Sequence, residues 1–160
     1  MHLLQAPSIA AGAPWSVVGS WVWSTNVANV DFTGLTCNEL FIFMRGVSAG
    51  ASGFRQFTMS VDNGANYFTG SSDYQATVAI GSEGNQGGIA LQAPATSNPV
   101  TATMWIPNLS MNGVPKMAVC NSIGQSQMFT GSTSPVNALR FTSVSSTGNY
   151  TAGSITLMGR

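Results

Sequence analysis

The sequence predicts an all-β protein, an antiparallel two-sheet jelly-roll sandwich of about eight to ten short strands. Helix-forming Glu, Lys and Arg are scarce in the 160 residues, whereas Thr, Val, Ser, Gly and Asn are frequent. Apolar residues recur at every second position in short runs, and each run ends at Gly, Asn, Ser or Pro. An immunoglobulin-like sandwich is disfavoured, because the chain is long for that fold and has no Cys-Trp-Cys spacing.

The expected strands follow from this alternation, taken in order along the chain. The run 15–24 places Trp15, Val17, Trp21 and Trp23 on one predicted face. The run 39–47 is apolar at odd and even positions alike, which predicts a central strand covered on both sides. Later runs with alternating apolar residues lie at 54–62, 74–80, 100–106, 117–119, 139–141 and 155–157.

Turn-forming residues separate these runs. Asp62, Asn63 and Gly64 lie between two apolar stretches, and Asn-Gly is the preferred pair for a type I′ hairpin turn. Residues 84–88 and 93–99 are expected to form longer loops, and 112–113 and 132–135 are expected to form turns. No linker divides the chain, so the prediction is an N-terminal arm over 1–14 and a single β-sandwich domain over 15–160.

Charge excludes several classes of partner. Five basic and five acidic side chains give a net charge of zero, and only 6% of residues are charged, where about 25% is usual. No basic stripe is available to neutralise phosphates, which argues against nucleic-acid binding. No run approaches the ~18 apolar residues that span a bilayer, and no basic amphipathic helix suits a membrane surface, so no membrane insertion is expected.

The arm and the cysteines bear on targeting and redox chemistry. The arm has no Lys or Arg before its apolar part, which Pro7 interrupts, so a flexible arm is expected rather than a signal peptide. Cys37 and Cys120 lie far apart with no histidine nearby. Two buried, reduced cysteines are expected, and a disulfide between them stays open.

The residues that could carry catalysis are few. The only histidine is His2, in the arm, where no nucleophile is positioned beside it. A glycosidase needs two carboxylates at a set separation, and the sequence assigns no such pair. The acids are Asp31, Glu39, Asp62, Asp73 and Glu83. We therefore expect no enzyme, no catalytic residues, no metal site and no cofactor.

Aromatic side chains are the remaining candidates for a binding role. Tyr67, Phe68 and Tyr74 follow the Asn63-Gly64 turn beside polar residues, and such rings suit stacking on a sugar. Ordinary packing between strands is the alternative for the same three residues. Trp15, Trp21 and Trp23 are expected to belong to the core or to a subunit interface, because large aromatics anchor both.

Three segments carry a resemblance to a known family: residues 31–35 (DFTGL), 60–68 (SVDNGANYF) and 153–160 (GSITLMGR). Together with the tryptophan-rich opening strand and the run 40–45, they resemble C-terminal jelly-roll domains of bacteriophage tail-fibre and minor virion structural proteins. Chains of that family often end in a strand of the type Gly-x-Ile-x-x-x-Gly-Arg. The resemblance extends over most of the chain from Trp15 onward.

The resemblance implies a non-enzymatic virion protein, made in the bacterial host cytoplasm, that forms symmetric homo-oligomers, often trimers. Its role would be host attachment as a tail-fibre or tail-tip module, with a host surface glycan as a candidate receptor. Tail fibres of this kind normally attach through a shaft; none is expected here, so the arm 1–14 is the expected tether to other virion proteins. This favours, as an alternative, a capsid decoration protein that stabilises the shell. A free-standing lectin is a further alternative. The expected homo-oligomer agrees with the near-zero net charge, which favours association between identical chains.

Overall fold

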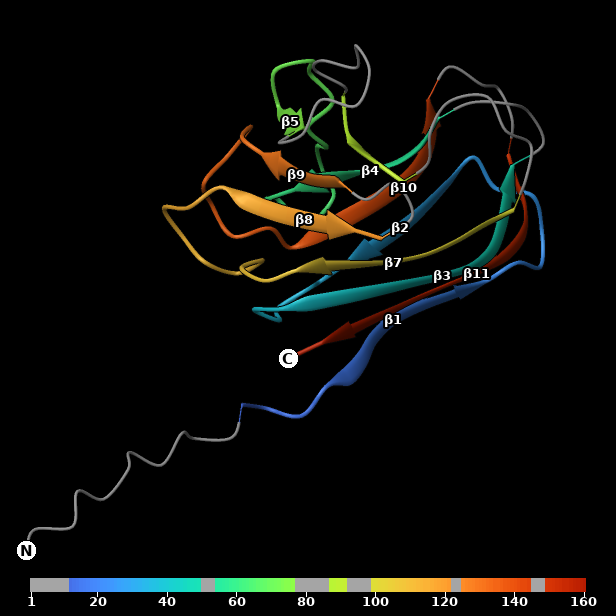
Figure 1. Ribbon diagram of the computed structural model, residues 1–160, viewed down its shortest axis with the longest axis horizontal. Helices are drawn as coiled ribbons and strands as arrows, with labels where there is room; N and C mark the ends of the chain where they lie inside the picture. The colour runs from blue at the N-terminus through green and yellow to red at the C-terminus, as the bar shows by residue number, and fades with distance from the viewer. Residues whose placement is uncertain (1–11, 50–53, 77–86, 92–98, 122–124, 145–148) are drawn as a thin grey trace, which may run out of the picture.

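The computed structural model describes residues 12–49, 54–76, 87–91, 99–121, 125–144 and 149–160. These residues form eleven β-strands and no helix (Figure 1). The strands are β1 (Ser16–Val22), β2 (Asn29–Thr33), β3 (Leu40–Ala49), β4 (Phe54–Ser60), β5 (Tyr74–Ala76), β6 (Ile89–Ala90), β7 (Val100–Ile106), β8 (Lys116–Cys120), β9 (Gln125–Phe129), β10 (Ala138–Val144) and β11 (Tyr150–Gly159).

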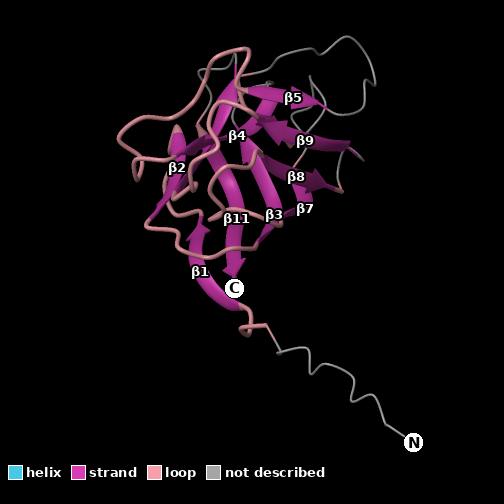
Figure 2. Ribbon diagram, turned by 90° about the vertical axis from the view of Figure 1, so that its left-hand side faces the viewer, coloured by secondary structure: helices cyan, strands magenta, loops and turns pink. Residues whose placement is uncertain are grey.

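The strands form two antiparallel sheets. The larger sheet has seven strands in the order β1-β11-β3-β7-β8-β9-β5 (Figure 2), and the smaller has four in the order β2-β10-β4-β6. The predicted all-β architecture with two antiparallel sheets is therefore confirmed. The number of strands exceeds the predicted eight to ten, because β2, β6 and β9 do not correspond to any of the predicted runs.

One hydrophobic core draws on both sheets. In β7 the alternation is regular, with Val100, Ala102, Met104 and Ile106 buried and the residues between them more exposed. The smaller sheet contributes side chains such as Phe57 and Phe141, which have no exposed surface. Burying a side chain of this size stabilises the fold by about 1.5–3 kcal/mol. The period-two pattern of the sequence thus identifies the inward face of these strands.

The closing segment of the chain is an interior strand. β11 pairs with β1 on one side and with β3 on the other, and Ile155 and Leu157 point into the core. Arg160 continues the pairing, because its N–H donates to Glu39 O (3.1 Å) and its carbonyl accepts from Asn38 N–H (2.8 Å). Residues 153–160 therefore hold the larger sheet together.

A bulge between β11 and β3 depends on glycine. Gly153 has φ +101°, and a Cβ built there would lie 2.6 Å from both Gly46 O and Val47 Cα. Gly46, on the facing strand, has φ +60°, and the register of both strand pairs of β3 shifts at this level. Only glycine combines this backbone conformation with so close an approach of two strands.

The predicted face of the first strand is divided by a second bulge. The register of β1 against β11 shifts between Val17 and Gly19. Val17 consequently pairs with the outward-facing Met158, whereas Trp21 pairs with Ile155 and packs on the core. The expectation that Trp15, Val17, Trp21 and Trp23 share one face is therefore wrong, because the extra residue reverses the alternation.

The turn at Asn63-Gly64 has the predicted backbone but not the predicted role. Asn63 has φ +59° and Gly64 has φ +88°, and Ala65 N–H donates to Asp62 O (3.4 Å). β4, which precedes the turn, pairs with β10 and β6, whereas β5 beyond it pairs with β9 in the other sheet. The turn therefore lies in a crossover between the sheets, and the predicted hairpin is wrong.

Two buried polar side chains connect the sheets. The Tyr74 hydroxyl, on β5, accepts from Met59 N–H (2.8 Å) on β4 and donates to Phe68 O (3.0 Å). The Gln127 amide, on β9, accepts from Ala90 N–H (3.0 Å) and donates to Ala90 O (3.1 Å) on β6. Buried amide and hydroxyl groups need such partners, so these bonds fix how the sheets meet.

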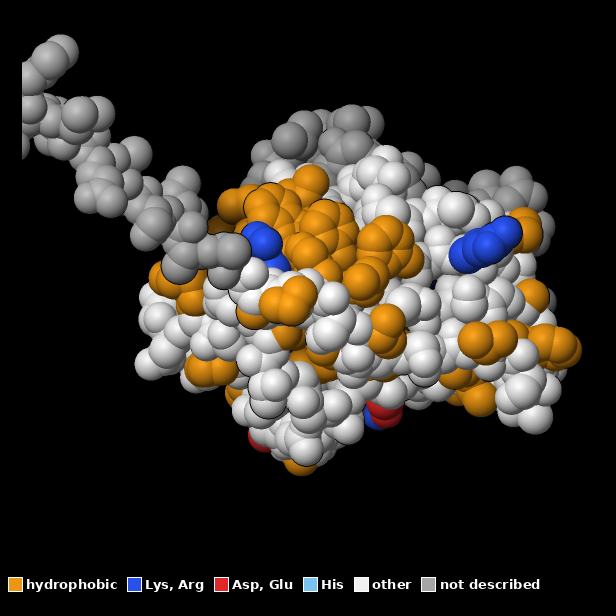
Figure 3. Space-filling model, turned by 90° about the horizontal axis from the view of Figure 1, so that it is seen from below, with side chains coloured by type: hydrophobic (Ala, Val, Ile, Leu, Met, Phe, Trp, Pro, Cys, Tyr) orange, Lys and Arg blue, Asp and Glu red, His pale blue; other side chains and the backbone are white. Residues whose placement is uncertain are grey.

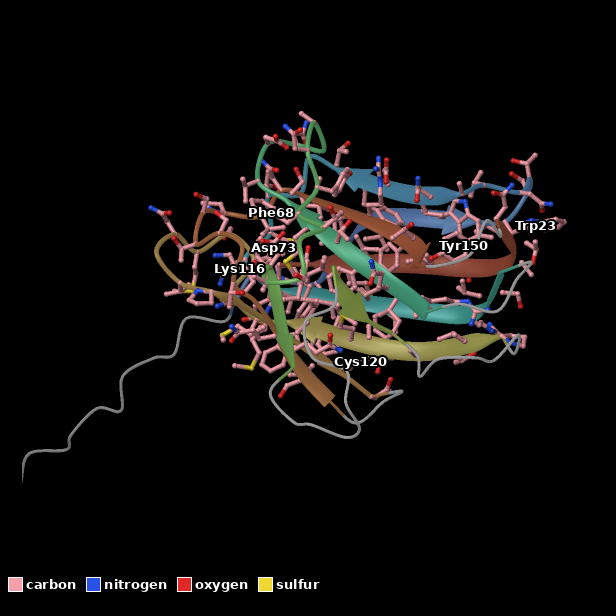
Figure 4. The ribbon with its side chains drawn as sticks, turned by 90° about the horizontal axis from the view of Figure 1, so that it is seen from above. Trp23, Phe68, Asp73, Lys116, Cys120 and Tyr150 are labelled. Carbon is pink, nitrogen blue, oxygen red and sulfur yellow. The ribbon has the colours of Figure 1, made fainter. Side chains whose placement is uncertain are left out.

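The chain's only lysine is fully buried. Lys116, labelled in Figure 4, begins β8. Its exposed fraction is 0%. Its Nζ donates to three backbone carbonyls: Met111 O, Val114 O (2.8 Å) and Thr133 O (3.3 Å). Burial lowers the pKa of Lys116. The ammonium therefore ties two turns to the start of β8.

The carboxylate of Asp62 organises the crossover turn and predicts an acid-sensitive contribution to stability. It accepts from Ser60 Oγ (2.6 Å), Asn66 N–H (2.9 Å) and Asn66 Nδ2 (2.7 Å). These hydrogen bonds, with that from Ser60 the strongest influence, lower the pKa of Asp62 from 3.8 to about 2. Because the folded-state pKa is depressed, the contribution is complete above the unfolded pKa and is lost as the pH falls toward 2.

We therefore expect wild type and Asp62→Asn to differ in pH dependence. Urea unfolding midpoints measured from pH 6 to pH 2 should fall more steeply for wild type below pH 4, and the two proteins should converge near pH 2. Parallel curves over the whole range would contradict the assigned role of the carboxylate.

Candidate interaction surface

The outward face of the larger sheet is apolar at its centre. In β3 the inward residues Leu40, Ile42 and Met44 are buried, as a central strand requires. The outward residues Phe41 and Phe43 are apolar too, and Phe43 is 40% exposed. No other described segment covers these rings fully. The predicted central position of β3 is confirmed, because the strand lies between β11 and β7. The prediction that β3 is covered on both sides is wrong for its outer side, where Phe43 is exposed.

A row of apolar side chains crosses five neighbouring strands in register. Val17 of β1 pairs with Met158 of β11, and Met158 pairs with Phe41 of β3. Phe41 pairs with Trp105 of β7, which pairs with Val119 of β8. Cross-strand neighbours point to the same side of a sheet, so the row is continuous. We call this row, with three adjoining side chains, the outer apolar face: Trp15, Val17, Phe41, Phe43, Trp105, Met117, Val119 and Met158.

The aromatic rings of the outer apolar face contact one another. Phe41 lies at their centre, with ring centroids 5.2 Å from Trp15, 5.9 Å from Phe43 and 6.3 Å from Trp105. The rings of Phe43 and Trp105 lie within 23° and 19° of the Phe41 plane. Figure 3 shows apolar side chains gathered in a continuous patch on the side of the molecule seen from below.

Charged groups lie at the margin of this face. Arg160 pairs with Glu39 (3.0 Å), and its guanidinium lies over the Trp15 ring, 4.8 Å from the centroid. Arg45 is exposed two residues beyond Phe43 on β3. The centre of the row carries no ionisable side chain. The outer apolar face thus combines an uncharged centre with arginine at its edges.

The outward face of the smaller sheet has a different chemistry. Arg140 of β10 and Asp31 of β2 are cross-strand partners and form a bidentate ion pair, with N–O distances of 2.8 and 2.7 Å. The hydrogen bond to Asp31 raises the pKa of Arg140. The guanidinium also lies 4.2 Å from the Tyr67 ring centroid. This face therefore satisfies its charges internally, whereas the outer apolar face leaves large rings exposed.

The three aromatic residues predicted to contact a sugar do not form one platform. Tyr74 is 2% exposed, and burial raises its pKa above the ordinary value. Phe68 is half-buried and packs edge-on against Phe129, with centroids 5.1 Å apart (Figure 4). Tyr67 is half-buried beneath Arg140. A surface contact through Tyr74 is at odds with its burial, and Tyr67 and Phe68 retain only part of their surface.

The three tryptophans near the start of the chain, Trp15, Trp21 and Trp23, occupy three different environments. Trp15 is half-buried and belongs to the outer apolar face. Trp21 packs against the core, with its ring edge-on to Tyr150 (6.1 Å). Trp23 is exposed beyond β1, and its Nε1 donates to Asn26 Oδ1 (3.3 Å) (Figure 4). These residues were predicted to belong either to the core or to a subunit interface. Trp21 packs against the core, whereas Trp15 lies on the outer apolar face, where it could take part in an interface.

The part of the chain described here holds no cluster of three or more His, Cys, Asp or Glu side chains that would suit a metal ion. Cys37 and Cys120 are buried and reduced, and burial raises the pKa of Cys37. His2 and Glu83 lie outside the described residues. Within the described ranges, no helix has the length and apolar character needed to cross a membrane.

Comparison with protein-family models, curated proteins and solved structures finds no match to this chain.

The outer apolar face could have been found in part from the sequence. The signal is the run 39–47, which is apolar at positions of both parities. A second signal is the coincidence of outward apolar residues in other strands, namely Trp105, Met117 and Val119. Alternation assigns these residues to the outer side, but only the strand order brings them next to Phe41.

Proposed function

We propose that this chain is a non-enzymatic structural protein of bacteriophage virions, a jelly-roll module that works by contact with other protein surfaces. The observation that carries the proposal is the outer apolar face, whose centre holds Phe41 and Trp105 and no charge. Exposed apolar surface of this kind marks interaction sites in folded proteins. A module that functions by docking requires such a surface and requires no catalytic group.

The family resemblance supports the same proposal through the closing segment. Residues 153–160 carry the pattern Gly-x-Ile-x-x-x-Gly-Arg, and they form most of the interior strand β11. Gly153 permits the bulge and Ile155 fills the core. The residues that define the pattern thus have structural roles in this fold, which is consistent with a shared architecture.

Within the virion we propose a tail-fibre or tail-tip module involved in host attachment, acting as a homo-oligomer. A capsid decoration protein is the alternative location. In either place, the arm 1–14 would bind another virion protein and a host surface glycan would be the receptor of the tail form. A free-standing lectin has less support, because Tyr74 is buried and the Tyr67 ring is covered by Arg140.

The test is the composition of purified phage particles. We expect peptides of this chain in density-purified virions at a fixed stoichiometry to the major capsid protein, measured by quantitative mass spectrometry. Immunogold labelling should then place the protein at the tail for host attachment or on the shell for decoration. Absence of the chain from purified virions would overturn the proposal.

A further inference from the structure

We propose that the outer apolar face is the surface through which two copies of this chain pair face to face. The inference deepens the proposed function, since it names the contact within the homo-oligomer. It rests on the proposed function in one respect, namely that the chain acts as a homo-oligomer. The occupant of the face is thus a second copy of the same chain.

The composition of the face matches the centre of a protein interface. Interface centres are enriched in Trp, Phe, Met and Arg and depleted in Lys, Asp and Glu. The outer apolar face is built from Trp, Phe, Met and Val, and Arg45 and Arg160 lie at its margin. A sugar-binding platform would instead need polar side chains among the rings, and the central row Val17, Met158, Phe41, Trp105 and Val119 contains none.

The exposed side chains of the face suit the centre of an interface. Val17 is 61% exposed, Trp105 is 37% exposed, and Met117 and Val119 are exposed to a similar degree as Phe43. A stable interface buries about 800 Å² on each partner, so these apolar side chains would form its centre and not its whole extent. Thr103 and Thr156 pair with Phe43 on either side and would belong to the polar rim of the contact.

The order of side chains along the row is self-complementary. Phe41 lies at its centre, Met158 and Trp105 lie on either side, and Val17 and Val119 form the ends. A two-fold axis at Phe41, parallel to β3, would place Val17 of one copy opposite Val119 of the other. It would also place the flexible Met158 against the broad ring of Trp105. A two-fold contact uses the same patch twice, so this one surface is sufficient for pairing.

Zero net charge removes the general repulsion between two identical chains. The described acidic side chain at the margin, Glu39, is already engaged by Arg160. Pairing would therefore desolvate rings and aliphatic groups at the centre without burying an unpaired carboxylate there.

The experiment measures the mass of the full 160-residue chain in solution as a function of concentration. Sedimentation equilibrium should give twice the mass of one chain for wild type. Trp105→Arg and Phe43→Arg each place a charge in the face, and each should raise the dimer dissociation constant at least tenfold. Asn29→Arg adds the same charge to the exposed outer side of β2 and should leave the dissociation constant unchanged. Thermal unfolding of each of the three variants reports whether the fold is retained.

Three outcomes would overturn the inference. A monomeric wild type would show that the face has another occupant, such as residues 1–11 or a different protein. A trimer would exclude the two-fold pairing. A dimer that persists in Trp105→Arg and Phe43→Arg would place the contact elsewhere. None of these outcomes affects the presence of the chain in virions, so the proposed function is judged separately.

Discussion

Gly153→Ala is expected to lower the free energy of unfolding by about 4 kcal/mol, the sum of backbone strain and overpacking. The new Cβ would lie 2.6 Å from Gly46 O and from Val47 Cα, and 2.7 Å from Gly46 C. All three are backbone atoms of the neighbouring strand, so no side-chain rotation relieves the contact. Because Gly153 also has φ +101°, alanine is strained there even without the clash.

Gly113→Ala is the matched control for this prediction. Gly113 also has a positive φ, +79°, but a Cβ there would have no atom within 4 Å. Gly113→Ala should therefore lower the free energy of unfolding only by the strain of the backbone conformation, about 1 kcal/mol. Melting temperatures should fall by about 10 °C for Gly153→Ala and by a few degrees for Gly113→Ala. Equal shifts would contradict the close approach of the β3 backbone to Gly153 at this bulge.

Lys116→Met is expected to destabilise the fold by about 3 kcal/mol, because part-buried carbonyls lose a charged donor. Methionine fills a similar volume but donates no hydrogen bond to Met111 O, Val114 O or Thr133 O. The two turns that these carbonyls belong to would then be held less firmly against β8. Urea unfolding measures the loss.

Arg45→Met provides the comparison for Lys116→Met at a concentration where the chain is monomeric, since it removes the same charge from an exposed side chain and should then change stability little. The burial of Lys116 has an independent readout. An amine-reactive reagent should leave the only lysine side chain unmodified in the folded protein and acylate it in urea. Rapid acylation under native conditions would contradict the buried position.

Much of the fold is predictable from alternation alone, because inward positions of a two-sheet structure recur with period two. The runs at β7 and β10 show this, since Val100, Met104, Leu139 and Phe141 are all buried. Alternation fails where a strand is short or bulged. β6 has only two residues, too few for a pattern, and the bulge after Val17 reverses the faces of β1.

The predicted sugar-binding site illustrates a different limit. Tyr67, Phe68 and Tyr74 are close in sequence, but the chain passes from the smaller sheet to the larger between β4 and β5. Tyr74 therefore enters the core while Tyr67 lies by Arg140. Residues of the outer apolar face show the converse. Val17, Phe41, Trp105, Val119 and Met158 are scattered along the chain, and strand order alone makes them neighbours.

The position of β11 has a consequence for the time course of folding. Ser16 pairs with Gly159, so the first described strand reaches the larger sheet only through the last one. Pairings between such distant segments carry a high cost in loop closure, and folds rich in them form in milliseconds to seconds rather than microseconds. Val17 and Met158 join Phe41 only when this slow step is complete. A partly folded chain thus does not yet present the complete outer apolar face, and the pairing proposed above would begin only after the monomer has folded.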